Sequence, residues 1–159
     1  MSEPLPPRSP FANSTFAKNP LLVLLTNKGE IQIELYADQA PIHVAQVAGF
    51  AEQGGYNRLP WHRIVSDFVI QGGDPDCSGY GGSENPLRSG INPVRFERGT
   101  LGMPRNADFD TGGLQLFITH VPTPNLDGLY TVFGQVRAGL EVVDLIEPGD
   151  FIISARVIR

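Results

Sequence analysis

The sequence predicts a mainly β fold, which we expect to be a closed eight-stranded antiparallel β-barrel capped by two α-helices. Eight short segments have the composition or the alternation of strands, and Gly- and Pro-rich turns separate them. Another segment repeats apolar residues at three- and four-residue steps, as an α-helix does, and a second, shorter helix is expected near the end. Closing the sheet removes exposed strand edges, and the helices would cover the two ends of the barrel.

The first elements have clear local signals. Residues 21–25 and 31–35 are two strands joined through Asn27-Lys28-Gly29, which is a hairpin signal. Pro41 suits a first helical position, and Gly54-Gly55 ends the predicted helix at 41–53. The remaining strands are expected at 62–65, 68–71, 99–102, 114–118, 131–136 and 151–158, and the second helix at 140–146.

Size and composition indicate one soluble globular domain. The chain has 159 residues, of which 41% are hydrophobic and 18% charged, so it can bury a core of its own. Residues 1–20 contain five prolines and no periodicity, which is typical of a flexible arm. We therefore divide the chain into an N-terminal arm, 1–20, and a folded domain, 21–159, and expect a monomer.

The charge balance argues against nucleic acid as a partner. Twelve Lys and Arg against 17 Asp and Glu give a net charge of -5, and no basic run occurs that would neutralise a row of phosphates. The first twenty residues lack the apolar region of a signal peptide, and the apolar run at 21–25 is too short to cross a bilayer. We expect a cytoplasmic protein, or a periplasmic or lumenal one if a signal segment has been removed.

Cysteine and histidine usage indicates neither a disulfide nor a structural metal site. Cys77 is the only cysteine, and the three histidines, His43, His62 and His120, are too far apart in sequence for a zinc motif.

Arg63 is the most informative residue for function. It lies in the segment 61–74, WHRIVSDFVIQGGD, among apolar residues that alternate toward one face. A charge beside apolar surface costs several kcal/mol unless it is paired or used, so Arg63 needs a ligand or a structural partner. Taken alone, an ion pair with Asp67 or Asp74 is the more common arrangement.

Several ordered motifs resemble one family. The sequence WHRIV is followed by FVIQGGD, then by GTLGM, GGLQLFIT from Gly112 and LDGLYTVFGQV from Leu126. In order and spacing, over residues 21–159, they resemble the cyclophilin peptidyl-prolyl cis-trans isomerases, and bacterial members in particular. The resemblance implies an enzyme that accelerates rotation about X-Pro bonds in peptides and folding proteins, with no metal or cofactor. Its partners would be proline-containing peptides and unfolded proteins.

The resemblance also assigns roles to residues of this chain. Arg63 would be catalytic, while Gln71 and Gln115 would hold the substrate and Arg63 in place. Residues 103–107 would pair with the substrate backbone, and Tyr80 would narrow a second pocket. The proline pocket would be lined by Phe68, Val69, Leu116, Phe117, Leu126 and Tyr130, and the backbone-pairing segment includes Arg105 and Asn106.

Four positions depart from the usual family pattern, namely Val69, Leu116, Asn125 and Tyr130, where methionine, phenylalanine, tryptophan and histidine are common. Asn125 lacks the indole N–H and the aromatic face that help to bind cyclosporin. We therefore expect weak cyclosporin binding with isomerase activity retained.

The chemistry of the reaction is consistent with this assignment. Rotation about an X-Pro amide faces a barrier of roughly 18–20 kcal/mol, because the nitrogen lone pair is delocalised into the carbonyl. A fixed guanidinium can stabilise the twisted state, in which that lone pair is localised.

Two other functions stay open from the sequence. The same groove in an adaptor or chaperone module would bind proline peptides with little turnover. A barrel that encloses a small apolar ligand is a third possibility. A hydrolase triad of His62, Ser66 and Asp67 is disfavoured because the sequence has no G-x-S-x-G motif.

Overall fold

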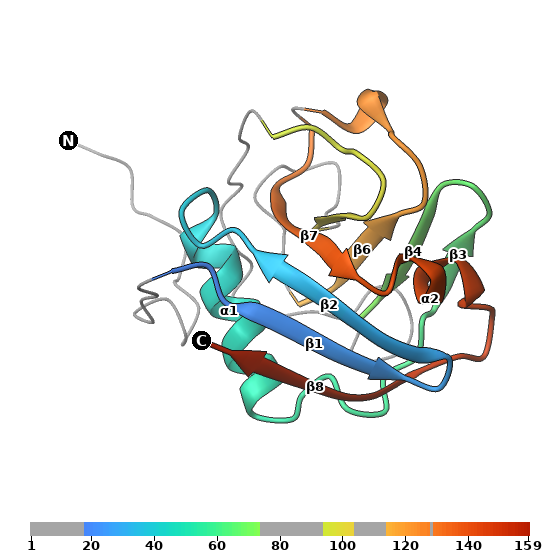
Figure 1. The fold of residues 1–159 in the computed structure, drawn as a ribbon, viewed down its shortest axis with the longest axis horizontal. Coiled ribbons are helices and arrows are strands. Elements are labelled where there is room, and N and C mark those ends of the chain that lie inside the picture. The colour runs from blue at the N-terminus through green and yellow to red at the C-terminus, as the bar shows by residue number, and fades with distance from the viewer. Residues whose placement is uncertain (1–17, 74–93, 104–113, 128) are drawn as a thin grey trace.

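The structure is a computed structural model that describes residues 18–73, 94–103, 114–127 and 129–159. Eight strands, two α-helices and one short 3-10 helix lie within these residues, and Figure 1 shows their arrangement. Every strand and α-helix expected from the sequence is present, with ends that differ by no more than two residues. In chain order they are β1 (Leu21–Thr26), β2 (Gly29–Leu35), α1 (Pro41–Glu52), β3 (Arg63–Val65), β4 (Val69–Gly72), β5 (Thr100–Gly102), β6 (Leu116–Thr119), η1 (Pro124–Leu126), β7 (Val132–Ala138), α2 (Leu140–Leu145) and β8 (Ile152–Ile158).

The β1–β2 hairpin forms as its sequence predicts. Thr26 pairs with Gly29 across a turn made by Asn27 and Lys28. The Thr26 hydroxyl oxygen accepts hydrogen bonds from the backbone N–H groups of Lys28 and Gly29, each at 3.1 Å. Gly29 has a φ of +140°, which a residue without Cβ adopts at little cost.

All eight strands belong to one antiparallel sheet. Their order is β3-β4-β6-β5-β7-β2-β1-β8, so β3 and β8 are the two edges. The sheet curls until these edges approach each other, but no ladder joins β3 to β8 in the described residues. The predicted closure is therefore partial, while the strand number and the antiparallel arrangement are as expected.

The gap between the edges is bridged by the chain just before each edge strand. The backbone N–H of Trp61 donates to the carbonyl of Asp150 at 3.0 Å, and that of Ile152 donates to the carbonyl of Leu59 at 2.8 Å. Between these two bonds, Pro60 and Phe151 form an isolated bridge. Proline has no N–H to donate, so it cannot extend a regular ladder. This explains why the barrel is closed by a short seam and not by paired strands.

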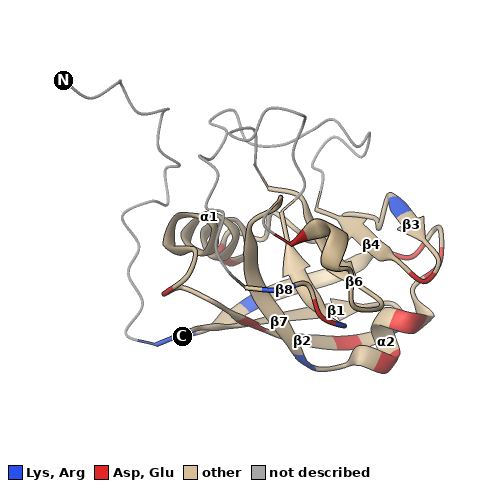
Figure 2. Ribbon diagram, turned by 90° about the horizontal axis from the view of Figure 1, so that it is seen from above, with Lys and Arg blue, Asp and Glu red and all other residues tan. Residues whose placement is uncertain are grey.

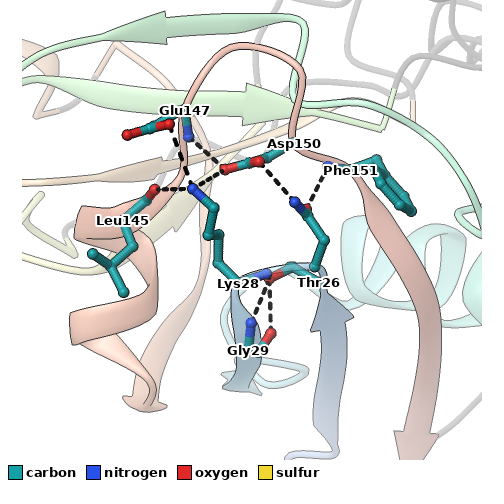
Figure 3. Close-up of polar contacts among 8 residues, drawn as sticks. Thr26, Lys28, Gly29, Leu145, Glu147, Asp150 and Phe151 are labelled. Carbon is teal, nitrogen blue, oxygen red and sulfur yellow. Dashed lines mark hydrogen bonds and ion pairs between the residues drawn. The ribbon is translucent and has the colours of Figure 1, made fainter.

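A network of polar contacts holds the β1–β2 turn against the segment that leads into β8 (Figure 3). Asn27 Nδ2 donates to Asp150 Oδ1 at 2.7 Å, and the backbone N–H of Phe151 donates to Asn27 Oδ1 at 2.9 Å. Lys28 Nζ lies 3.2 Å from Asp150 Oδ2 and 3.5 Å from a carboxylate oxygen of Glu147. The network fixes the chain beside the seam.

The two helices cover opposite ends of the curled sheet (Figure 1). Helix α1 is buried along most of its length and contacts β8, whereas α2 contacts β2. Leu22, Ile33, Ile70 and Phe133 are among the fully buried side chains that fill the interior. An interior packed with side chains does not fit the barrel that would enclose a small ligand. None of the helices in the described residues is long and apolar enough to span a membrane.

Candidate active site

Strand register brings Arg63, Gln71 and Phe117 together on one face of the sheet. Arg63 lies opposite Gln71 in the β3–β4 hairpin, and Gln71 lies opposite Phe117 in the β4–β6 pair. Directly paired residues point to the same face, and the next residues along each strand point to the other face. Accordingly the neighbouring row, Ile70 with Ile118, faces the core and is fully buried.

Arg63 is exposed, and a chain of two hydrogen-bonded glutamine side chains orients it. Its Nη1 lies 3.5 Å from Gln71 Oε1, and Gln71 Nε2 donates to Gln115 Oε1 at 2.9 Å. Because the Gln71 amide donates to Gln115, its oxygen is turned toward the guanidinium. Among the described residues Arg63 makes no ion pair, so a pair with Asp67 is absent, and Asp74 lies outside those residues.

The residues around Arg63 enclose a cavity of about 300 Å³. Arg63 and Gln71 supply polar groups, and the other lining side chains are apolar or aromatic. The Phe117 ring forms one wall and meets the Tyr130 ring edge to face, with centroids 5.7 Å apart. The lining residues are Arg63, Phe68, Val69, Gln71, Phe117, Leu126 and Tyr130.

A small hydrophobic cluster, separate from the main core, lies beneath this cavity. Its buried members are Val69, Phe96, Phe117 and Val132. The Phe96 and Phe117 rings are stacked, with centroids 5.6 Å apart and an interplanar angle of 14°. A Cβ on Gly102, which pairs with Phe117, would clash with the Phe117 ring, so glycine leaves the space that the ring occupies.

The wall that carries Leu126 is attached to the backbone of Phe96. The Phe96 N–H donates to Asp127 Oδ1 at 2.7 Å, and the Phe96 carbonyl accepts from the Thr123 N–H at 2.9 Å. These bonds lie on either side of η1, so they hold the Leu126 turn at both ends. Phe96, Gly102 and Asp127 were not among the predicted site residues, although Gly102 and Asp127 lie in the GTLGM and LDGLY motifs.

The structure places the other predicted residues in three ways. Leu116 is fully buried in the main core and does not line the cavity, because it alternates with Phe117 along β6; its assignment to the pocket was wrong. Asn125 is exposed on η1. Tyr80, Arg105 and Asn106 lie outside the described residues.

One buried histidine lies outside the residues that line this cavity. His43 of α1 is buried, and burial lowers its pKa to about 4, so it is neutral near pH 7. Within the part of the chain that the structure describes, no three His, Cys, Asp or Glu side chains gather as a metal site requires.

The geometry defines what the cavity can bind. An apolar pocket of this volume can bury a small ring, and a permanently charged guanidinium at its rim can donate hydrogen bonds to that ring or its neighbours. There is no adjacent nucleophile and base pair among the lining residues, so the arrangement favours binding and electrostatic stabilisation over covalent chemistry.

Comparisons with known proteins point to one family. The sequence profile described as "Cyclophilin type peptidyl-prolyl cis-trans isomerase/CLD" matches residues 21–156. The chain is 41% identical over 142 residues to a peptidyl-prolyl cis-trans isomerase of Helicobacter pylori, covering 87% of each chain. It is also 41% identical over 136 residues to peptidyl-prolyl cis-trans isomerase B of Bacillus subtilis, covering 84% of this chain and 94% of the relative.

A solved structure leads to the same conclusion. A cyclophilin-type isomerase of Cryptosporidium parvum, crystallised in the presence of the dipeptide Ala-Pro, superposes with a TM-score of 0.81 at 28% identity, covering 87% of this chain and 98% of that one. The match of sequence motifs, family profile and fold confirms the predicted resemblance: this chain belongs to the cyclophilin-type peptidyl-prolyl cis-trans isomerases.

Proposed function

We propose that the cavity binds the proline ring of an X-Pro segment and that Arg63 catalyses rotation about the preceding amide bond. The observation that carries the proposal is the position of Arg63. Its guanidinium is at the rim of an apolar pocket, is oriented by Gln71, and has no ion-pair partner among the described residues.

The twisted amide is the state that this arrangement would stabilise. In the planar amide the prolyl nitrogen offers little to a donor, whereas in the twisted amide its lone pair is localised and accepts a hydrogen bond. Arginine suits this role because it stays protonated at any working pH and its planar fork is rigid. The carbonyl group can rotate while the proline ring stays buried against Phe117.

Arg63 accounts for only part of the expected acceleration. One hydrogen bond from a charged group contributes about 1.5–3 kcal/mol, and each tenfold in rate needs about 1.4 kcal/mol. A single contact therefore gives one or two orders of magnitude. Burial of the proline ring by Phe68, Phe117 and Leu126 would supply binding energy and orientation for the remainder.

The substrates we propose are proline-containing peptides and unfolded protein segments. The pocket is open at the surface and combines apolar and aromatic walls with the polar groups of Arg63 and Gln71, so it can take both a proline ring and the backbone next to it. The presence of Ala-Pro in the crystals of the Cryptosporidium isomerase is in keeping with this choice.

A short Ala-Pro-Phe peptide provides the test, with cis–trans exchange followed by a protease-coupled assay or by magnetisation transfer. We expect turnover by the wild type and a loss of about ten- to a hundredfold in kcat/KM for Arg63→Ala. Arg63→Lys is the matched control, because it keeps the positive charge but lacks the planar guanidinium. We expect its activity to lie between those of Arg63→Ala and the wild type. An Arg63→Ala variant with nearly full activity would contradict the catalytic role, and wild-type binding without turnover would instead support the adaptor function.

We also propose weak binding of cyclosporin. Asn125 is exposed on η1 and has neither the aromatic face nor the donor of the tryptophan common at this position. Inhibition titrations of the wild type and of Asn125→Trp test this, and we expect the variant to bind the drug at least about tenfold more tightly. Tight, nanomolar inhibition of the wild type would contradict the proposal.

A further inference from the structure

A second cavity, of about 330 Å³, lies on the other side of the β3–β4 hairpin from the active site. Arg63 lines the first cavity, and the next residue, Ile64, lines the second. The hairpin is therefore a wall that the two cavities share. His120 also lines the second cavity and is joined to this wall, because its backbone N–H donates to the Phe68 carbonyl at 2.8 Å.

The charges around the second cavity favour a cation. Arg98 donates from Nη1 and Nη2 to the two oxygens of Asp144, at 3.1 and 2.7 Å, so the positive charge of Arg98 neutralises the negative charge of Asp144. Asp67 also lines the cavity, is exposed, and has no hydrogen bond or ion pair with any other described residue. One negative charge is thus left over. Figure 2 shows acidic residues in red on α2 and on the turn beside β3, at the same end of the molecule.

His120 is a second indication of a ligand, and it also interacts electrostatically with Asp144, another residue of the cavity. Its side chain lines the cavity, the residue is only 9% exposed, and neither ring nitrogen has a hydrogen-bond partner in the described part of the chain. Buried polar groups are nearly always paired, because an unpaired one has lost its hydration without replacement. Both ring nitrogens are buried, so a turn of the ring would bring one of them to a polar group that enters the cavity.

We propose that this cavity binds the basic side chain, lysine or arginine, of a peptide or protein ligand. Ile64 and Ile146 provide apolar contacts for the methylene stem, and the Asp67 carboxylate binds the charged head beside the His120 ring. Such a site would give the protein a preference for basic segments, in keeping with its net charge of -5. It is independent of the proline pocket, although both ligands would contact the same hairpin.

The test is an NMR titration of the ¹⁵N-labelled full chain with Nα-acetyl-lysine N-methylamide. We expect saturable shifts at the amides of Asp67, His120 and Val121, with Leu126 and Tyr130 unaffected. The matched probe carries a second acetyl group on Nζ, which removes the charge but keeps the stem, and we expect it to bind about tenfold more weakly or not at all.

Two variants separate this site from the active site. Asp67→Asn removes the charge, and asparagine tolerates the φ of +56° found at this turn. We expect this variant to bind the lysine probe about three- to tenfold more weakly and to isomerise Ala-Pro-Phe as the wild type does. Arg63→Ala should bind the probe as the wild type does, so failure of the catalytic proposal would leave this result intact. Equal binding of the charged and neutral probes, unchanged affinity in Asp67→Asn, or shifts confined to the proline pocket would each overturn the inference.

Discussion

Phe96 and Asp127 are joined by a hydrogen bond of 2.7 Å from the Phe96 backbone N–H to Asp127 Oδ1. Phe96 stacks on Phe117, the main aromatic wall of the proline pocket, and Asp127 directly follows Leu126, which forms another wall. The bond therefore fixes the distance between two walls that come from different parts of the chain. Because the N–H is partly buried and the acceptor is charged, this bond is of the stronger kind.

Replacing Asp127 by alanine should loosen the pocket without touching the substrate. We expect KM for Ala-Pro-Phe to rise about three- to tenfold with a smaller change in kcat, and the free energy of unfolding to fall by about 1–3 kcal/mol. Asp127→Asn keeps an acceptor oxygen at the same place, so it should recover most of both quantities. The contrary outcome is equal loss in the two variants, which would mean that the negative charge and not the hydrogen bond matters.

Gly102 should tolerate no side chain, because the Phe117 ring occupies the space where a Cβ would lie. In Gly102→Ala that Cβ would also lie 2.8 Å from Cε1 of Phe96. We expect the Phe117 ring to be pushed toward the proline pocket, with a fall in kcat/KM of about tenfold and a loss of about 1–3 kcal/mol of stability. The double variant Gly102→Ala/Phe117→Leu should regain stability but not activity. If the double variant is no more stable than Gly102→Ala, the clash is not the cause.

Local signals in the sequence were sufficient to predict the elements of the fold. The Asn27-Lys28-Gly29 turn, the helix start at Pro41 and its end at Gly54 each depend on a few adjacent residues, and each is present in the structure. The seam at Pro60 was missed, although a proline just before the strand predicted at 62–65 is itself a sign that a ladder stops there. Closure of a sheet depends on residues far apart in sequence, which local patterns do not report.

The candidate site was predicted mainly through resemblance, and its error has a simple cause. Leu116 and Phe117 were both assigned to the pocket, yet adjacent residues of a strand face opposite sides, so only Phe117 lines it. Strand alternation alone was enough to avoid this. Phe96 and Gly102 were missed because their importance comes from contact with Phe117, which only the three-dimensional structure reveals.

His43 should make the stability depend on pH between about 6.5 and 4. Burial lowers its pKa to about 4 in the folded protein, whereas an unfolded chain has a histidine pKa of about 6.5. As the pH falls through this window the unfolded state binds a proton that the folded state does not, so stability decreases, by up to about 3 kcal/mol. Urea unfolding at pH 7.5, 5.5 and 4.5 measures the slope. In His43→Leu, an apolar residue that suits a helix replaces the histidine, so the contribution of His43 to the change of stability with pH should disappear. An unchanged dependence on pH would show that other groups cause it.

Asp150 should contribute more to stability than the lysine paired with it. Its Oδ1 accepts from Asn27, its Oδ2 accepts from the backbone N–H of Glu147 at 2.8 Å, and Lys28 adds an ion pair at the surface (Figure 3). The hydrogen bond from Asn27 is the main reason that the pKa of Asp150 is below its usual value, so this contribution is complete above about pH 4 and is lost as the pH falls below it. We expect Asp150→Ala to lower the free energy of unfolding by about 1–3 kcal/mol, because the partly buried hydrogen bonds from Glu147 and Asn27 lose their acceptor and the chain beside the barrel seam is released.

Lys28→Met is the matched variant. It removes a solvent-screened charge and the 3.3 Å hydrogen bond from Nζ to the Leu145 carbonyl, so its effect should be much smaller and should decrease in high salt. Denaturant unfolding of both variants at pH 7, with and without added salt, separates the two contributions. Equal destabilisation by the two substitutions would mean that the ion pair, and not the bonds to Asn27 and Glu147, holds the β1–β2 turn against the seam.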